Sequence, residues 1–189
     1  MCSSDLKIFG FVQLVAQEKI LRGWALAAQG QEEAGIAQMR EGLATWGAMG
    51  VELYRAYQLM QLAEVYGTAG QAEEGLRVLV ETRAAVPHGE GRFYEAELAR
   101  LEGTLRLARS AESHMEAETC FRQALAIAHR QEAKSFELRA ATSLAHLWQS
   151  QGKRAEAYDL LAPIYGWFTE GFDTADLQEA KALLEELGG

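Results

Sequence analysis

Few side chains in this sequence have the types and spacing that chemistry at a metal site would need. The histidines are His88, His114, His129 and His146. They lie far apart, and none belongs to an H-E-x-x-H or similar metal-binding pattern. The only cysteines, Cys2 and Cys120, are too few for a disulfide framework or a zinc site. We therefore interpret the histidines and Cys120 as surface or packing residues and predict no metal.

Acid–base, nucleophilic and phosphate-binding chemistry also lack a supporting pattern. Adjacent glutamates such as Glu32 and Glu33 point apart on a helix, whereas general acid–base catalysis needs two groups that face one pocket. Ser110 and Ser113 have no identifiable histidine partner for a hydrolase triad. No G-x-x-x-x-G-K-[ST] loop occurs, so phosphates have no predicted cradle. We expect neither catalysis nor a cofactor in this chain.

The most informative pattern is an internal repeat in which a small residue precedes a large apolar residue by four positions. The pairs are Gly35 and Met39, Gly75 and Leu79, Ala117 and Phe121, and Ala157 and Leu161. The small residues lie 40, 42 and 40 positions apart. A period in this range is typical of solenoids, in which each repeat buries its apolar face against a neighbour. The sequence therefore predicts an all-α fold of stacked helical hairpins.

Each repeat is interpreted as two helices, A and B, separated by a turn. The turns are predicted at Gly30, Gly70 and Gly152 and in a looser stretch at residues 110–113, because glycine readily ends a helix. The predicted A helices cover residues 7–28, 52–68, 92–109 and 135–151, and the B helices cover residues 31–46, 71–85, 111–129 and 153–165.

Two features distinguish the C-terminal part of the pattern. Pro163 falls inside the last B helix and predicts a kink or a break near residues 160–162. Asp173 resembles an N-cap for one more helix. Its predicted apolar side consists of Leu177, Ala180, Leu184 and Leu187. This helix is expected to cap an open stack, because its outer face is charged. The residues of this predicted outer face are Asp176, Glu179, Lys181, Glu185 and Glu186.

Composition excludes several classes of protein. A formal net charge of -9 argues against nucleic acid or an anionic membrane surface as the main partner, because both require a positive footprint. No stretch approaches about 18 uninterrupted apolar residues, and the N-terminus lacks the pattern of a signal peptide. We expect a cytoplasmic protein.

The first six residues fit nothing that follows. They can be encoded by GTG TGC TCT TCC GAT CT plus one base, which looks like a common sequencing-adapter end read in frame. We therefore expect residues 1–6 to be non-native and residues 7–189 to form one α-solenoid domain, a fragment of a longer protein, with about four hairpins and a capping helix. A contiguous genomic read with the same six codons would refute the adapter origin.

The spacing of small and aromatic residues resembles the tetratricopeptide repeat (TPR), whose helix A carries an aromatic residue three positions after a small one. The pairs here are Ala63 with Tyr66 and Ala145 with Trp148. The small, large and small pattern of helix B is clearest at Ala117, Phe121 and Ala124. The repeat of 40 to 42 residues is longer than the usual unit of about 34. The resemblance implies a right-handed superhelix.

Residues 133–141 and 165–173 look like the C-terminal part of large bacterial signalling proteins. In those proteins, a class III nucleotide cyclase domain or another effector precedes a STAND-type ATPase and then TPR-like repeats. The resemblance covers nearly all of residues 10–187. It implies a regulatory or interaction role, because this chain has no cyclase or ATPase motif.

In TPR arrays, one side of the A helices lines most of the concave face. Aligning the small residue of each A helix with the TPR pattern gives the corresponding positions in this chain. The residues are Gln17, Ile20, Trp24, Tyr57, Met60, Glu64, Glu97, Arg100, Thr104, Arg139, Thr142 and His146. Arg100 and Arg139 are the sharpest candidates, because an arginine facing a groove can hold a carboxylate with two hydrogen bonds. The alternatives are an ion pair with Glu97 or Glu137 for the arginines and packing between helices for the large apolar members.

These observations predict a non-catalytic interaction and regulatory module of a bacterial signalling protein. Its partner would be a protein, a peptide or another domain of the parent protein. Two alternatives stay open: sensing of a small-molecule effector, and self-association through the exposed first helix. A closed apolar pocket of about 300 to 1,000 Å³ would favour the sensor, and an open groove would favour a peptide or domain partner.

Overall fold

The computed structural model of this chain describes residues 3–48, 54–85 and 91–189. In these ranges it contains nine α-helices, two short 3-10 helices and no strand, which confirms the all-α prediction. The chain divides into two compact units, Met1–Gly91 and Arg92–Gly189. We describe each unit by itself.

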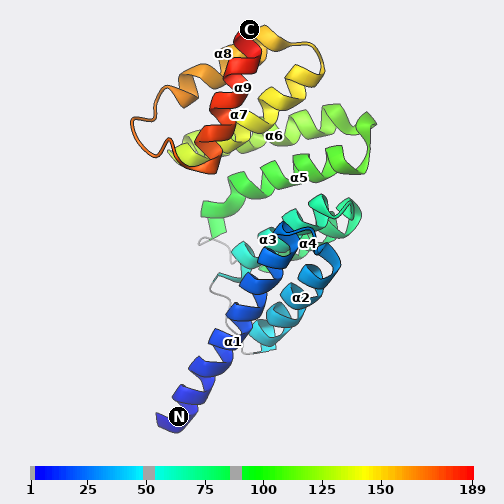
Figure 1. The fold of residues 1–189 in the computed structure, drawn as a ribbon, viewed down its shortest axis with the longest axis vertical. Helices are drawn as coiled ribbons and strands as arrows, with labels where there is room; N and C mark the ends of the chain where they lie inside the picture. The colour runs from blue at the N-terminus through cyan, green and yellow to red at the C-terminus, as the bar shows by residue number, and fades with distance from the viewer. Residues whose placement is uncertain (1–2, 49–53, 86–90) are drawn as a thin grey trace. The chain divides into compact units, whose positions relative to one another are not determined.

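The first unit consists of two helical hairpins (Figure 1). Helix α1 (Ser3–Ala28) pairs with α2 (Glu32–Ala48), and α3 (Arg55–Thr68) pairs with α4 (Ala72–Ala85). Helix α3 packs on α2 and also contacts α1, so the second hairpin stacks on the first. The predicted order of A and B helices is present.

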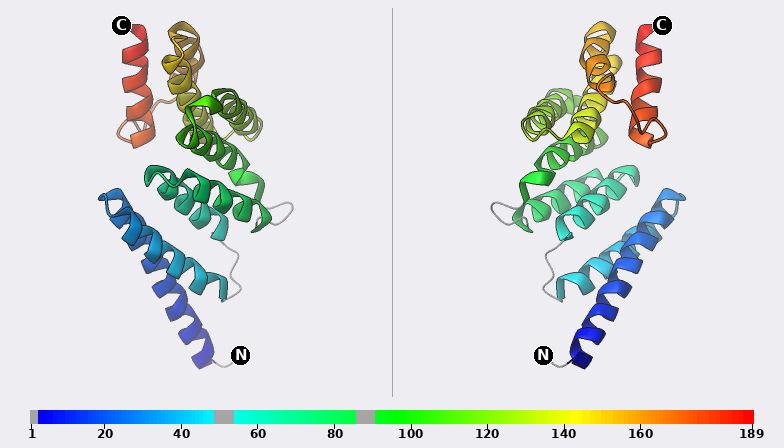
Figure 2. Two further views of the ribbon diagram at one scale, coloured as in Figure 1. Left: turned by 90° about the vertical axis from the view of Figure 1, so that its right-hand side faces the viewer. Right: turned by 90° about the vertical axis from the view of Figure 1, so that its left-hand side faces the viewer.

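The second unit contains two further hairpins and a final helix. Helix α5 (Glu95–Arg109) follows the 3-10 helix η1 (Gly91–Tyr94), and η2 (Ala111–Ser113) links it to α6 (His114–Arg130). Helix α7 (Lys134–Ser150) pairs with α8 (Arg154–Tyr165) and is followed by α9 (Ala175–Gly188). Figure 2 shows α9 beside this last hairpin, where it contacts both α7 and α8. Helix α9 is therefore the predicted capping helix.

Three of the predicted turns use glycine in the left-handed conformation. Gly30, Gly70 and Gly152 have φ angles of 80°, 72° and 78°. In each turn the following N–H donates to a carbonyl five residues earlier, as from Gln31 to Leu26 at 3.0 Å. This hydrogen bond belongs to the Schellman motif, which satisfies carbonyls at a helix C-terminus.

The four small and large pairs that define the repeat are all buried. The role of the large residue is clearest in two hairpins, α1 with α2 and α5 with α6. A Cβ added to Gly23 would lie 2.8 Å from Met39 Cγ, and one added to Gly103 would lie 2.6 Å from the Phe121 ring. The large residue of each of these B helices therefore packs against a glycine in its A helix. This close approach is the physical basis of the repeat.

The C-terminal predictions need three corrections. Of the predicted kink or break near residues 160–162, the break is wrong, because α8 continues to Tyr165. Pro163 lies in the last turn, where its missing N–H removes a single intrahelical bond. The N-cap of α9 is Thr174 rather than Asp173. On its apolar side, Leu183 is 1% exposed whereas Leu184 is only partly buried.

Candidate interaction surfaces

The A helices of the first unit place the predicted site residues in two environments. Ile20 and Met60 are 1% and 4% exposed, so they pack between helices, as their alternative interpretation held. Trp24 and Tyr57 are 44% and 46% exposed and do not follow that interpretation. The polar positions, Gln17 and Glu64, are exposed. In this unit only part of the predicted set is accessible to a partner.

In the second unit, three predicted site residues meet in one ion-pair network. Arg100 Nε and Nη2 on α5 donate to the two carboxylate oxygens of Glu97 at 3.0 and 2.7 Å. Arg139 Nη1 on α7 lies 3.0 Å from Glu97 Oε1. Glu97 and Arg100 are only 5% and 8% exposed. Arg100 thus has the ion pair with Glu97 that its alternative interpretation allowed, and binding of a partner by either arginine stays a prediction.

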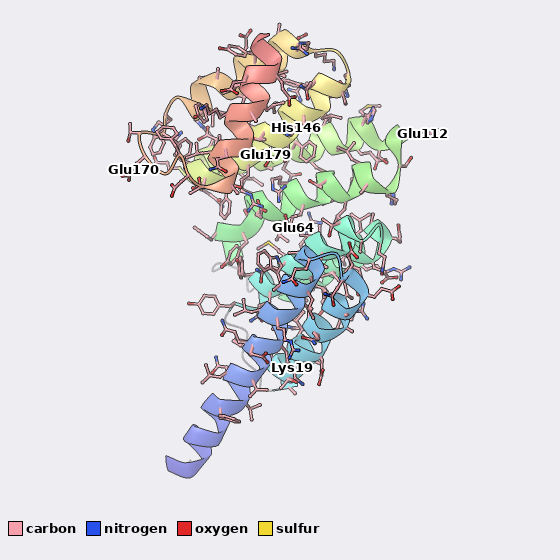
Figure 3. All side chains as sticks on the ribbon, in the orientation of Figure 1. Lys19, Glu64, Glu112, His146, Glu170 and Glu179 are labelled. Carbon is pink, nitrogen blue, oxygen red and sulfur yellow. The ribbon has the colours of Figure 1, made fainter. Side chains whose placement is uncertain are left out.

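The network continues from α7 to the capping helix. Arg139 Nε lies 3.8 Å from Asp176 of α9, and His146 Nε2 lies 3.2 Å from Glu179 Oε1. Figure 3 shows His146 and Glu179 near each other on α7 and α9. We call these residues the A-face ladder; its members are Glu97, Arg100, Arg139, His146, Asp176 and Glu179. The ladder joins the A helices of the second unit to α9.

Two predicted residues on this face make no ion pair. Thr104 is exposed, and its hydroxyl donates to the Arg100 carbonyl at 3.2 Å. Thr142 is 5% exposed, and its hydroxyl has no hydrogen-bond partner among the described residues.

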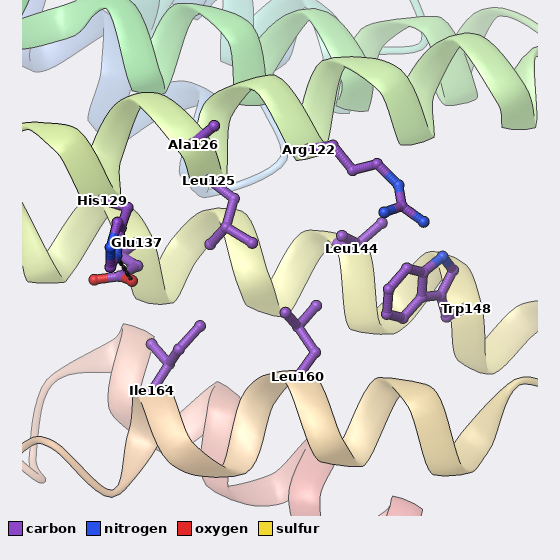
Figure 4. Close-up of a pocket in the computed structure, with 9 residues that line it drawn as sticks. All are labelled: Arg122, Leu125, Ala126, His129, Glu137, Leu144, Trp148, Leu160 and Ile164. Atoms are coloured by element: carbon purple, nitrogen blue, oxygen red, sulfur yellow. Dashed lines mark hydrogen bonds and ion pairs between the residues drawn. The ribbon is translucent and has the colours of Figure 1, made fainter.

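A pocket of about 390 Å³ lies on the other side of α7, between α6 and α8. It is open to solvent, and its centre is apolar (Figure 4). The central side chains are Leu125 of α6, Leu144 of α7, and Leu160 and Ile164 of α8. We call it the α6–α8 pocket.

Charged and aromatic side chains define one end of the α6–α8 pocket. The Arg122 guanidinium lies 5.2 Å from the centre of the Trp148 ring, within the range of a cation–π interaction. Arg122 also donates from Nε and Nη2 to Glu118 Oε1, at 3.1 and 2.7 Å. These hydrogen bonds lower the pKa of Glu118 below its ordinary value of 4.5, against the effect of burial, so this carboxylate stays ionised.

The opposite end carries a buried carboxylate, Glu137. Glu137 is 6% exposed, and burial alone would raise its pKa. Lys134 Nζ at 2.7 Å and His129 Nδ1 at 3.0 Å outweigh burial, so the pKa of Glu137 is lowered. The α6–α8 pocket therefore combines an apolar centre with an ion pair at each end.

The described residues offer little support for other kinds of site. Within them, no group of three or more His, Cys, Asp or Glu side chains is arranged to hold a metal ion. None of the helices in these ranges combines the length and apolar character that crossing a membrane requires.

Comparison with known proteins identifies the architecture. No family model matches the chain, and no curated protein matches it. A crystal structure of nearly identical TPR-like repeats, from a kinesin light chain candidate of Podosopora anserina, is 19% identical, with a TM-score of 0.59 over 90% of this chain and 84% of that chain. The structure of a single-residue variant is 18% identical, with a TM-score of 0.60 over 94% of both chains. The fold is a TPR-like helical-hairpin solenoid.

The residues predicted from the TPR-like pattern all lie on the A helices, as expected, but that prediction does not include the α6–α8 pocket. Its lining comes mainly from the B helices α6 and α8, which the transferred face does not include. One signal was available in the sequence. Arg122, Leu125, Ala126 and His129 recur at helical spacing along one side of α6. Such a stripe does not by itself distinguish a pocket wall from core.

The ladder predicts a pH-dependent contribution of α9 to stability. The hydrogen bond to Glu179 raises the pKa of His146 above 6.5 against the effect of burial, and the same bond lowers the pKa of Glu179 below 4.5. The contribution of His146 is complete below its unfolded-state pKa and is lost as pH rises through its folded-state pKa. The contribution of Glu179 is complete above its unfolded-state pKa and is lost as pH falls through its folded-state pKa.

We therefore expect this exposed pair to contribute most between about pH 4.5 and 6.5, by ~0.2 to 1 kcal/mol. Urea unfolding of wild type and His146→Gln from acid to alkaline pH measures the difference, which should shrink as pH rises above this window. An NMR titration of the His146 ring gives its folded-state pKa directly. A value at or below 6.5 would contradict the prediction.

Proposed function

We propose that this chain is a non-catalytic protein-binding and regulatory module of a bacterial signalling protein. The TPR-like fold supports a role in protein interaction in general. The sequence resemblance to the repeats that follow cyclase and STAND-type ATPase domains supports the signalling context. The observation that carries the proposal is the α6–α8 pocket, which is open, has an apolar centre and is bounded by charged groups.

The form of the α6–α8 pocket favours a peptide or protein segment over a small effector. Small-molecule sites bury most of their ligand in a concave cavity. This pocket instead opens between two parallel-running walls, α6 and α8, so a bound segment can extend beyond it. Leu160 and Ile164 lie one turn apart on the α8 wall and offer apolar contacts to a partner side chain.

The A-face ladder is a weaker candidate for the binding surface. Its arginines and His146 already contact carboxylates of the same chain, so a partner would have to replace those contacts. The side chains at the centre of the α6–α8 pocket are apolar and pack with hydrophobic clusters, so a partner that contacts them replaces no ion pair.

Selection from a phage-displayed random peptide library tests the proposal. Peptides are selected on the wild-type chain and then measured against Ile164→Asp, which places a charge in the apolar centre. We expect selected peptides to lose binding by at least about tenfold, because a buried unpaired carboxylate opposes apolar contact. Arg122→Glu, at a mostly exposed side chain, provides a second variant of the α6–α8 pocket that leaves its apolar core intact.

Val80→Asp is the matched control, because Val80 is 66% exposed on α4 and lies outside the α6–α8 pocket. Circular dichroism must show equal helix content for all variants. Failure to select any peptide, or peptides that bind Ile164→Asp and Arg122→Glu as well as wild type, would contradict a peptide-binding role for this pocket. Saturable binding of small molecules there would instead favour effector sensing.

A further inference from the structure

Helix α1 exposes large apolar side chains on the side opposite α2. Phe11, Leu14 and Leu21 are 69%, 68% and 50% exposed. Their spacing of three and seven residues places them along one side of the helix. The other side is also apolar, since Ala16 and Ile20 are 0% and 1% exposed where they pack on Gly42 of α2. A helix that is apolar on both sides is suited to two neighbours.

Two charged residues lie within the exposed apolar side. Glu18 and Arg22 follow Leu14 by four and eight residues, so they lie about 40° and 80° from it around the helix, on either side of Phe11, and they border the same shallow hollow as Leu14 and Leu21. Neither side chain makes an ion pair or hydrogen bond with any described residue. We call Phe11, Leu14, Glu18, Leu21 and Arg22 the α1 outer face.

The second unit shows what the equivalent face does in the same fold. Helices α1 and α7 can be aligned on their small residues, Gly23 and Ala145. In this alignment Leu14 corresponds to Phe136, and Glu18 corresponds to Ala140. Phe136 packs against a cluster of α5 and α6 that contains Ala96, Ile127 and Ala128, and Ala140 packs in a cluster with Ala99 and Ala124. In α7 this face is thus a helix-packing surface. The α1 outer face has the same register and suits a helical neighbour.

The charges on the α1 outer face determine which neighbour fits. A hairpin that presented alanines, as α5 and α6 do to Ala140, would bury Glu18 and Arg22 without partners, which is unfavourable because a buried charge loses its hydration. A second copy of α1 running in the opposite direction places Glu18 of each copy opposite Arg22 of the other. Twofold interfaces are self-complementary in this way, because each contact between two positions occurs twice.

We propose that this chain forms a twofold homodimer through antiparallel packing of its α1 outer face. Glu18 and Arg22 are one turn, about 6 Å, apart along the helix, so the twofold axis passes between them. Leu21 then lies beside the axis, and Leu14 and Phe11 extend the apolar contact outward. The proposal is independent of the proposed function, because the α6–α8 pocket lies in the other unit.

Sedimentation equilibrium of the 189-residue chain over a range of concentrations tests self-association. We expect the mass to rise from 20.8 kDa towards twice that value. Leu14→Glu and Leu21→Glu should remain monomeric at concentrations where wild type is dimeric. Val80→Glu, an equally exposed apolar position on α4, should dimerise as wild type does. A wild-type chain that is monomeric throughout, or a dimer that both leucine variants leave intact, overturns the proposal.

Charge exchange tests the antiparallel arrangement. Glu18→Arg and Arg22→Glu each juxtapose like charges across the axis and should each raise the dimer dissociation constant by about tenfold or more. An equimolar mixture of the two variants restores both opposite-charge pairs, so it should form a heterodimer about as tight as the wild-type dimer. The double variant should also regain wild-type affinity. Single variants that dimerise normally, or a mixture that shows no recovery, overturn the arrangement.

Discussion

Replacing Glu97 with alanine is expected to lower the free energy of unfolding by about 3 to 5 kcal/mol. The Glu97 carboxylate is 5% exposed and binds arginines on two different helices, α5 and α7. Without it, the Arg100 guanidinium, in a side chain only 8% exposed, loses its bidentate partner. Removing one member of a buried ion pair is costly because the remaining charge keeps its desolvation penalty.

Urea unfolding followed by circular dichroism measures this loss, and the chain supplies a matched control. Glu74 and Arg77 on α4 form a pair with the same three-residue spacing, but their side chains are 38% and 67% exposed. Glu74→Ala should therefore change stability by no more than ~1 kcal/mol. Glu97→Gln keeps the shape of the side chain, so its loss in free energy of unfolding should lie between the losses for Glu97→Ala and Glu74→Ala.

The difference between Glu97→Ala and Glu74→Ala also tests whether the A-face ladder can bind a partner. A large loss for Glu97→Ala would show that Arg100 and Arg139 hold α5 and α7 together, which makes them poor candidates for releasing their carboxylate to a partner. If Glu97→Ala costs no more than Glu74→Ala, the A-face ladder contributes little to folding. Its arginines would then be candidates for binding once more.

The parts of the fold that could be predicted from sequence depend on local signals. A glycine after each of three A helices is sufficient to locate the turns, because few other residues adopt a positive φ easily. The small and large pairs locate the B helices, since Met39 and Phe121 each need a glycine opposite them. These signals arise within one hairpin, so a single sequence contains them.

The parts that could not be predicted depend on which helix faces which. The α6–α8 pocket arises where three helices converge, and the leucines at its centre have the spacing of ordinary core residues. The pairing of Arg139 on α7 with Glu97 on α5 likewise depends on which helices pack together. Two residues of the supposed outer face of α9, Asp176 and Glu179, turn towards α7, because the cationic edge of α7 attracts them.

Replacing Gly35 with alanine is expected to lower the free energy of unfolding by about 1 to 3 kcal/mol. A Cβ at this position would lie 2.5 Å from the Gly23 carbonyl oxygen and 2.9 Å from the Ala27 backbone nitrogen. Both atoms belong to the backbone of α1, so no side chain can move to make room. Helices α1 and α2 must separate, and the separation loosens the contact of Met39 with Gly23.

A glycine-to-alanine substitution elsewhere in α2 should instead raise the free energy of unfolding. Gly47 has no atom within 4 Å of an added Cβ, so Gly47→Ala should stabilise the chain by about 0.5 to 1 kcal/mol through helix propensity alone. Urea unfolding of both variants separates close packing from propensity. If Gly35→Ala also stabilised the chain, propensity would outweigh the contact, and the small residue at this position of the repeat would not be required for packing α1 against α2.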